Sequence, residues 1–150
     1  MAPRTLGITD YDMDSPLKAV RRLMLESNGL ITIAFRRILV IRGEDNIRNA
    51  ASGDASSIDI SGNWLTSPWA HIEPAMAYQM GLPIMVVREK GVRMDGMLEP
   101  GVAGIYLPSF ETGRDLDDYF GSAEWTDLVW KWESQVRSVV AKKGEPPSLY

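Results

Sequence analysis

Apolar residues along this chain occur in two kinds of pattern: short continuous runs and longer stretches with helical spacing. Residues 30–35 and 83–87 are short runs rich in β-branched side chains, which predict buried strands. Ser15-Pro16 predicts the start of a helix and Asn28-Gly29 its end, directly before the first run. The apolar positions of that helix recur at spacings of three and four: Leu17, Val20, Leu23 and Met24.

The rest of the chain carries weaker patterns. Residues 4–8, 38–41 and 103–107 are short strand candidates, the second of them a strand extension or an edge strand. Residues 43–63 are rich in Ser, Asp, Asn, Ala and Gly, and a loop of this length is typical of a functional lid or of disorder. Residues 122–143 predict a long amphipathic helix. Its apolar face consists of Trp125, Leu128, Val129, Trp132, Val136 and Val139 or Val140.

Helices that alternate with buried strands predict the α/β class, with a three-layer arrangement around a mainly parallel sheet. We expect residues 30–35 and 83–87 to be its inner strands, with helices on both faces. No repeat or linker divides the chain, so residues 1–143 are expected to form a single domain. The Pro-rich residues 144–150 predict a flexible tail.

Composition narrows the functional classes. The chain has 150 residues, of which 45% are hydrophobic, so it can bury a core without disulfides. A net charge of −4 argues against nonspecific nucleic-acid binding. With no cysteine and one histidine, thiolate chemistry and a histidine-rich metal site are excluded, and we expect no cofactor. No apolar run is long enough for a membrane span and no signal peptide is evident, so a cytoplasmic protein is expected.

The most informative segment is 66–83. Ser67 is a predicted helix cap, Pro68 suits the first turn, and Gly81 suits the end. At about 100° per residue, three large apolar side chains fall within roughly 20° of one line along this helix: Trp69, Met76 and Met80. Glu73 lies only about 40° from that line. Because a carboxylate is rarely left on a core stripe unless something pairs with it or uses it, Glu73 is the first candidate for a catalytic residue.

Pro74 affects where this helix begins. An interior proline kinks a helix, so we expect an irregular start from Ser67 and a regular helix from about His71, with Pro74 in its first turn. His71 lies about 160° from Glu73 on the helix, too far round to form a dyad. We interpret His71 as exposed or associated with the cap.

Each candidate also has a structural interpretation. Glu73 can pair with an arginine or accept from backbone amides, but a carboxylate early in a helix beside a parallel sheet is well placed for a ligand crevice. Trp69 can stack on a ring or pack in the core. Ser67 can bond a ribose hydroxyl, although capping is the more common role.

Further candidates follow the first buried run and the N-terminus. Phe35 and Arg36 stand at the carboxyl end of a strand, where ligands of parallel sheets bind, although Arg36-Arg37 also suits a solvated pair. A polar loop near the N-terminus carries Asp10, Tyr11, Asp12 and Asp14. This loop can orient a ribose, but it lacks the spacing and glycine of a calcium loop, so we predict no metal site. Trp130 lies off the apolar face of its helix, which indicates a partner surface.

The segment after residue 66 resembles a known superfamily. Its motif is Ser67-Pro68-Trp69 followed by Glu73, Ala77, Gly81 and Pro83 ahead of an apolar strand. This is similar to TIR-like and nucleoside 2-deoxyribosyltransferase-like domains, in which the helix carries the Glu that does the chemistry. Residues 15–20 and 89–99 look like a bacterial subgroup of that superfamily, and the resemblance covers residues 3–108.

The resemblance implies a flavodoxin-like or TIR-like fold and a nucleotide or nucleoside ligand. It implies cleavage or transfer at an N-glycosidic bond, in NAD or in a nucleoside, with Glu73 as catalytic carboxylate. Together with the positions described above, we expect five substrate-binding residues: Phe35, Arg36, Ser67, Trp69 and Asp10. Such domains open with a strand and helix before the segment that matches residues 4–8, and this chain begins too late to contain them. We therefore expect a homo-oligomer or swapped element that completes the pocket, or a degraded site.

Two classes of function follow. One is an N-glycosidase or transferase. The other is a noncatalytic nucleotide-sensing or oligomerisation module of a bacterial signalling or defence system.

Overall fold

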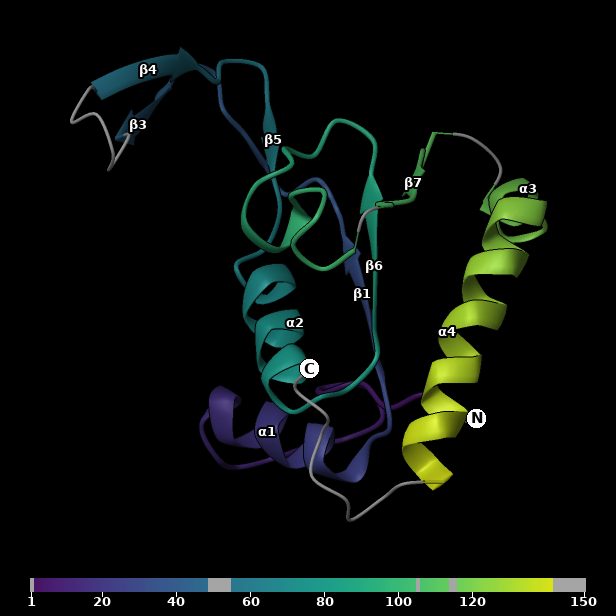
Figure 1. Cartoon of the computed structure of the whole chain (residues 1–150). Coiled ribbons are helices and arrows are strands. Elements are labelled where there is room, and N and C mark those ends of the chain that lie inside the picture. The colour runs from purple at the N-terminus through teal and green to yellow at the C-terminus, as the bar shows by residue number, and fades with distance from the viewer. Residues whose placement is uncertain (1, 49–54, 105, 114–115, 142–150) are drawn as a thin grey trace.

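The chain folds around a parallel sheet of three strands in the order β1–β6–β7, with helices on either side (Figure 1). The computed structural model describes residues 2–48, 55–104, 106–113 and 116–141, so the predicted tail at 144–150 lies outside the described residues. In chain order the elements are α1 (Pro16–Glu26), β1 (Leu30–Ala34), β2 (Ile38–Leu39), β3 (Glu44–Arg48), β4 (Ala55–Asp59), β5 (Trp64–Leu65), α2 (Trp69–Gln79), β6 (Ile84–Glu89), η1 (Gly96–Leu98), β7 (Ser109–Phe110), α3 (Leu116–Phe120) and α4 (Ala123–Ala141).

The two runs predicted as strands pair with each other in parallel. Their register runs from Leu30 opposite Ile84 to Ala34 opposite Arg88. β6 lies between β1 and β7, so the prediction of an inner strand is confirmed for residues 83–87. Among the described residues β1 pairs only with β6, which makes it an edge strand rather than an inner one.

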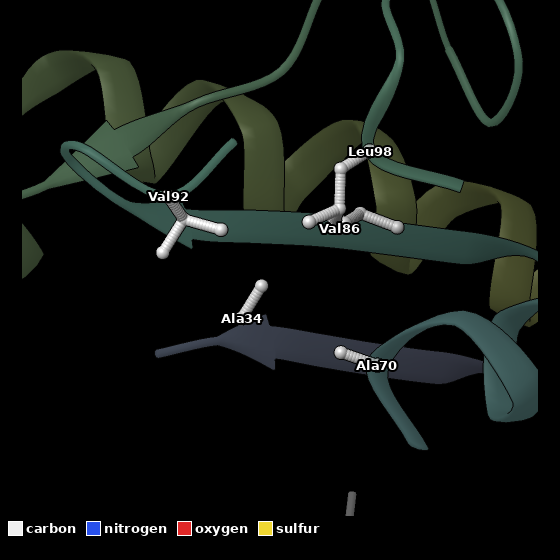
Figure 2. Close-up of a cluster of buried hydrophobic side chains, with 5 residues drawn as sticks. All are labelled: Ala34, Ala70, Val86, Val92 and Leu98. Atoms are coloured by element: carbon white, nitrogen blue, oxygen red, sulfur yellow. The ribbon is translucent and has the colours of Figure 1, made fainter. Parts of the chain in front are cut away.

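One side of the sheet packs against α2 and η1. Figure 2 shows a cluster in which small side chains meet larger ones, made of Ala34, Ala70, Val86, Val92 and Leu98. Ala34 and Leu98 are both 0% exposed. Small residues allow the helix to approach the strands closely, and the larger side chains fill the remaining space at interior density. A second cluster joins α1 to α2 through Val20, Met24 and Ala77.

The other side of the sheet packs against α3 and α4. Met85, Val87 and Phe110 are buried against aromatic and aliphatic side chains of these helices. α4 also lies close to the turn before β1, because a Cβ built on Gly29 would fall 2.6 Å from Cγ2 of Val136. The predicted long helix and its apolar face are therefore confirmed within the described residues.

This second side leaves part of β1 uncovered. Ile31, Ile33 and Phe35 are 39%, 40% and 49% exposed, whereas Thr32 and Ala34 on the opposite face are buried. The prediction that residues 30–35 are buried on both faces is wrong, because α4 packs over β6 and β7 and does not extend across β1. We call Ile31, Ile33 and Phe35 the β1 stripe.

Several weaker predictions are corrected by the structure. Residues 4–8 form a turn rather than a strand, because the amides of Ile8, Thr9 and Asp10 all donate to the carbonyl of Thr5. In the predicted strand 103–107, residue 105 lies outside the described residues and the other four are not in a strand. The third strand begins at Ser109, where Phe110 pairs with Glu89. The helix 16–26 forms as predicted, but its Leu17 is 53% exposed.

The described residues of the segment 43–63, which leave out 49–54, are not a structureless loop. β3 and β4 form an antiparallel hairpin that begins with Glu44 opposite Asp59. Below it, β2 and β5 pair antiparallel, with Ile38 opposite Leu65. The described side chains of β4 are exposed, and the two strands project from the rest of the domain (Figure 1).

α2 also begins earlier than predicted. It starts at Trp69, which places Pro74 inside the helix rather than in its first turn. Since proline has no N–H, the carbonyl of Ala70 has no donor four residues along the helix. Pro74 is fully buried, so its ring fills space in the core. No helix among the described residues is both long and apolar enough to cross a membrane.

Candidate functional site

The carboxyl ends of β1 and β6 lie at the same end of the sheet as the start of α2. The chain that leaves β1 is tied to the entry of α2 by a hydrogen bond, in which Nη1 of Arg37 donates to Oγ of Ser67 at 3.1 Å. This contact places the chain after β1 beside the start of α2. The side chain of Phe35, however, packs on Phe110 at the face of the sheet away from α2, so Phe35 does not share a site with Ser67 and Trp69. The start of α2 and the chain after β1 lie at the end of the sheet where α/β proteins bind ligands.

Glu73 lies on α2 one turn after Trp69 and one turn before the buried Ala77. Its side chain is partly buried, and burial raises the pKa of its carboxyl group. Neither an ion pair nor a hydrogen bond to this carboxylate is found within the described residues. A partly buried carboxylate without a partner is unfavourable for stability, which is typical of a group kept for function.

The residues at the start of α2 have structural roles as well. Trp69 packs against the cluster of Val20, Met24 and Ala77, so its core interpretation is supported. Pro68, not Ser67, occupies the cap position. Oγ of Ser67 still accepts from the amide of Trp69 at 3.3 Å. Because this oxygen also accepts from Arg37, its own hydrogen remains available to donate to a ligand.

Arg36 is held in place by a residue that the sequence reasoning missed. Glu89, the last residue of β6, is 5% exposed. Its carboxylate accepts from the backbone amide of Arg36 at 2.8 Å, from Nε of Arg36 at 2.8 Å and from Oγ1 of Thr112 at 2.5 Å. Burial acts to raise the pKa of Glu89, but the hydrogen bonds from Thr112 and Arg36 outweigh burial and the pKa is lowered.

Aromatic rings border Arg36. The guanidinium carbon lies 5.8 Å from the centroid of the Trp64 ring, within the range of a cation–π contact. Phe35 contacts Phe110 edge to face, with ring centroids 5.6 Å apart and planes at 83°. Phe35 remains half exposed.

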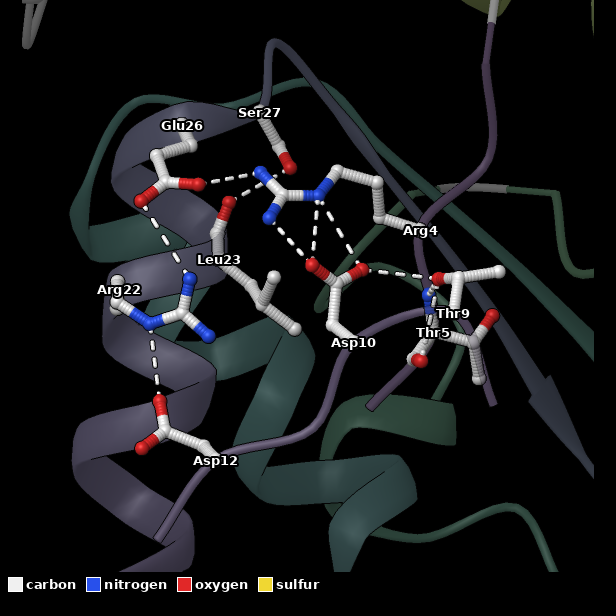
Figure 3. A network of polar contacts seen from close by, with 9 residues as sticks. All are labelled: Arg4, Thr5, Thr9, Asp10, Asp12, Arg22, Leu23, Glu26 and Ser27. Atoms are coloured by element: carbon white, nitrogen blue, oxygen red, sulfur yellow. Dashed lines mark hydrogen bonds and ion pairs between the residues drawn. The ribbon is translucent and has the colours of Figure 1, made fainter. Parts of the chain in front are cut away.

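Asp10 is not brought to this site. Figure 3 shows it bound to Arg4, whose guanidinium also contacts Glu26 in the last turn of α1. That turn leads directly into the amino end of β1, at the opposite end of the strand from Arg36. The neighbouring Asp12 pairs with Arg22 at 2.9 Å. The acidic loop is thus a set of ion pairs that fastens the N-terminal segment to α1.

Other polar groups and hollows do not extend the site. Nε2 of His71 lies 3.9 Å from Asp95. A hollow of about 150 Å³ is lined by residues of β6 and α4, including Met85 and Trp132, and a second lies beside Arg42 and Asp59. Glu73 lines neither. In the described part of the chain no group of three or more His, Asp or Glu residues is placed to hold a metal ion.

Comparisons with protein families, with curated proteins and with solved structures find no match to this chain.

Proposed function

We propose that this chain is a TIR-like or deoxyribosyltransferase-like α/β domain that binds a nucleotide or nucleoside at the carboxyl end of its sheet. In this proposal Glu73 is the carboxylate that acts in cleavage or transfer at the N-glycosidic bond. The observation that carries it is the partly buried Glu73 carboxylate, which has no partner among the described residues and lies on the helix that begins at that end. The flavodoxin-like, three-layer arrangement belongs to the same proposal.

The chemistry requires little more than such a group. When the bond between C1′ and the base breaks, positive charge develops on the ribose, and the base leaves with the bonding electrons. A nearby carboxylate stabilises this charge or attacks C1′ itself, and water then supplies the hydroxyl in hydrolysis. In this proposal the hydroxyl of Ser67 donates to a ribose hydroxyl, whereas the ring of Phe35, which packs on Phe110 at the face of the sheet away from α2, does not share a site with Glu73.

The test is the substitution Glu73→Gln, which removes the charge and changes little volume. Incubation with NAD and with nucleosides, followed by chromatography of the released base, is expected to show turnover for the wild type. Glu73→Gln is expected to lower the rate at least 100-fold, because loss of a group that stabilises transition-state charge costs several kcal/mol in the barrier.

Glu99→Gln is the matched control, since Glu99 is exposed and follows η1, which packs beside α2. Equal rates in the wild type and Glu73→Gln would remove Glu73 from the catalytic role.

The alternative function is a noncatalytic nucleotide-sensing or oligomerisation module. The observations that favour it are the free edge of β1 and the position of Glu73 outside both hollows. Under either function we propose a homo-oligomer and a cytoplasmic location. If the wild type and Glu73→Gln both bind a nucleotide and neither releases a base, the result would support the noncatalytic module.

A further inference from the structure

The guanidinium of Arg36 is bound through its Nε atom, whereas its two Nη atoms have no partner among the described residues. The carboxylate of Glu89 accepts from Nε and from the backbone amide, and the guanidinium carbon lies over the Trp64 ring. Neither Nη atom has a hydrogen-bond partner in the described residues, and the side chain is 34% exposed. These two nitrogens form the fork that binds the oxygens of a phosphate or carboxylate in bidentate fashion.

Two more arginines are close to Arg36 in the chain or in the strand register. Arg37 follows it directly, and Arg88 lies opposite Ala34 in the β1–β6 register. Nη1 of Arg88 donates to the carbonyl of Val92 at 3.1 Å, while its buried Nε has no partner within the described residues. No carboxylate among those residues pairs with either arginine.

The neighbouring acidic side chains other than Glu73 have basic partners. Asp45 and Asp95 both pair with Arg93, and Glu111 is paired with Lys90 at 2.6 Å. Glu89 pairs with Arg36. Arg37 and Arg88 are left without a carboxylate partner among the described residues, which favours an anionic ligand beside them.

We propose that Arg36, Arg37 and Arg88 form a phosphate-binding site, in which the buried Glu89 positions the guanidinium of Arg36. For the rest of the ligand this inference rests on the proposed function, and it restricts the ligand to a phosphorylated nucleotide rather than a free nucleoside. Glu89 is a positioning residue, because it contacts Arg36 and not the ligand. Arg36 makes the bidentate contact, and the other two arginines supply charge.

The experiment measures binding of three probes by calorimetry: AMP, adenosine and inorganic pyrophosphate. The wild type is expected to bind AMP at least tenfold more tightly than adenosine and to bind pyrophosphate as well. Arg36→Gln alone would leave Glu89 buried without its cation, so the paired variant Arg36→Gln/Glu89→Gln is used. It is expected to bind AMP and adenosine equally and to lose pyrophosphate.

Two further variants separate positioning from a structural role. Glu89→Gln keeps Arg36 but weakens its anchor, and is expected to reduce affinity for AMP and pyrophosphate severalfold while leaving adenosine unchanged. An equal loss for all three probes would mean that Glu89 only stabilises the fold. Arg21→Gln removes one exposed positive charge from α1 and is expected to match the wild type.

The outcomes distinguish this inference from the proposed function. Adenosine and AMP bound equally, with no pyrophosphate bound, would overturn the phosphate site and leave the proposed function standing. Pyrophosphate bound in an Arg36-dependent manner without any affinity for adenosine or cleavage of NAD would support the phosphate site and count against the proposed reaction. Absence of binding for all three probes would overturn both.

Discussion

At the scale of single residues, Glu73 and Glu89 are two carboxylates with opposite surroundings. Glu89 is buried and satisfied by Arg36 and Thr112, so it favours the folded state when ionised. Glu73 is partly buried with no partner in the described part of the chain, so its ionised form is less favourable in the folded protein than in the unfolded chain. The two residues therefore make opposite contributions to stability at neutral pH.

The Glu73→Gln variant is expected to be more stable than the wild type at pH 7. Because burial raises the pKa of Glu73, the folded state prefers the neutral form, and ionisation at neutral pH lowers stability. The gain is expected to be roughly 1 kcal/mol, or about 2–4 °C in Tm. This gain in stability should decrease as the pH falls through the pKa of Glu73 in the folded protein. It should vanish below the pKa of Glu73 in the unfolded chain, near 4.3.

Thermal unfolding between pH 8 and pH 4 checks this, with Glu99→Gln as the exposed control. A gain that persists unchanged at pH 4 would show that charge on Glu73 is not its cause.

The candidate site could be predicted from the sequence only in part. Glu73 stands out because a helical wheel places it beside Trp69 and Met80 within one short segment. The role of Glu89 could not be predicted, because its partner Arg36 is 53 positions away and only the pairing of two strands joins them. A lone carboxylate at the end of an apolar strand was the one signal available. Asp10 is a predicted substrate-binding residue, but its carboxylate forms an ion pair with Arg4 instead.

At the scale of elements, local patterns predict helices and buried strands better than exposed hairpins. The strand 84–89 and the helix 123–141 carry apolar side chains at regular spacing, so their periodicity reports their burial. β3 and β4 have largely polar sequences and the described side chains of β4 are exposed, so no alternation marks a buried face. The described side chains of these strands therefore carry no pattern from which their pairing could be predicted.

Because α4 contacts the turn before β1, adding one methyl group at Gly29 is expected to lower the stability of the fold substantially. In Gly29→Ala the new Cβ would lie 2.6 Å from Cγ2 of Val136 and 3.0 Å from Cζ2 of Trp132, so α4 must shift. We expect a loss of about 1–3 kcal/mol in the free energy of unfolding, measured by urea denaturation.

Gly113→Ala is the control for Gly29→Ala, because nothing lies within 4 Å of its Cβ position. Val136→Ala should lower the free energy of unfolding less in the Gly29→Ala background than in the wild type, since it removes the methyl group that clashes with the new Cβ. Additive losses would show that the two residues do not contact each other in solution.

At the scale of the whole molecule, the edge of β1 that has no strand partner among the described residues and the β1 stripe predict self-association. Residues 30–35 carry no charge and no proline, the devices that normally protect an edge strand. Antiparallel pairing of β1 with β1 of a second copy would satisfy the free backbone groups and cover Ile31 and Ile33. Light scattering is expected to give twice the 16.7 kDa of one chain at micromolar concentration.

Ile33→Lys is expected to shift this equilibrium to the monomer, because it places a charge in the middle of the edge. Leu25→Lys, at an exposed position of α1, is the control and should leave the mass unchanged. A wild-type mass of 16.7 kDa across a hundredfold range of concentration would contradict self-association.

The contact between Arg36 and Glu89 also has a consequence for the time that folding takes. The two residues are 53 positions apart, so the entire excursion through the β3–β4 hairpin and α2 must be closed before β6 can pair with β1. The chain loses conformational entropy when this loop closes, before the contacts between the strands can form and compensate for it. Parallel pairing of strands this far apart in sequence is therefore slow. α1 and α4 can form within microseconds, whereas the sheet is expected to assemble in milliseconds to seconds.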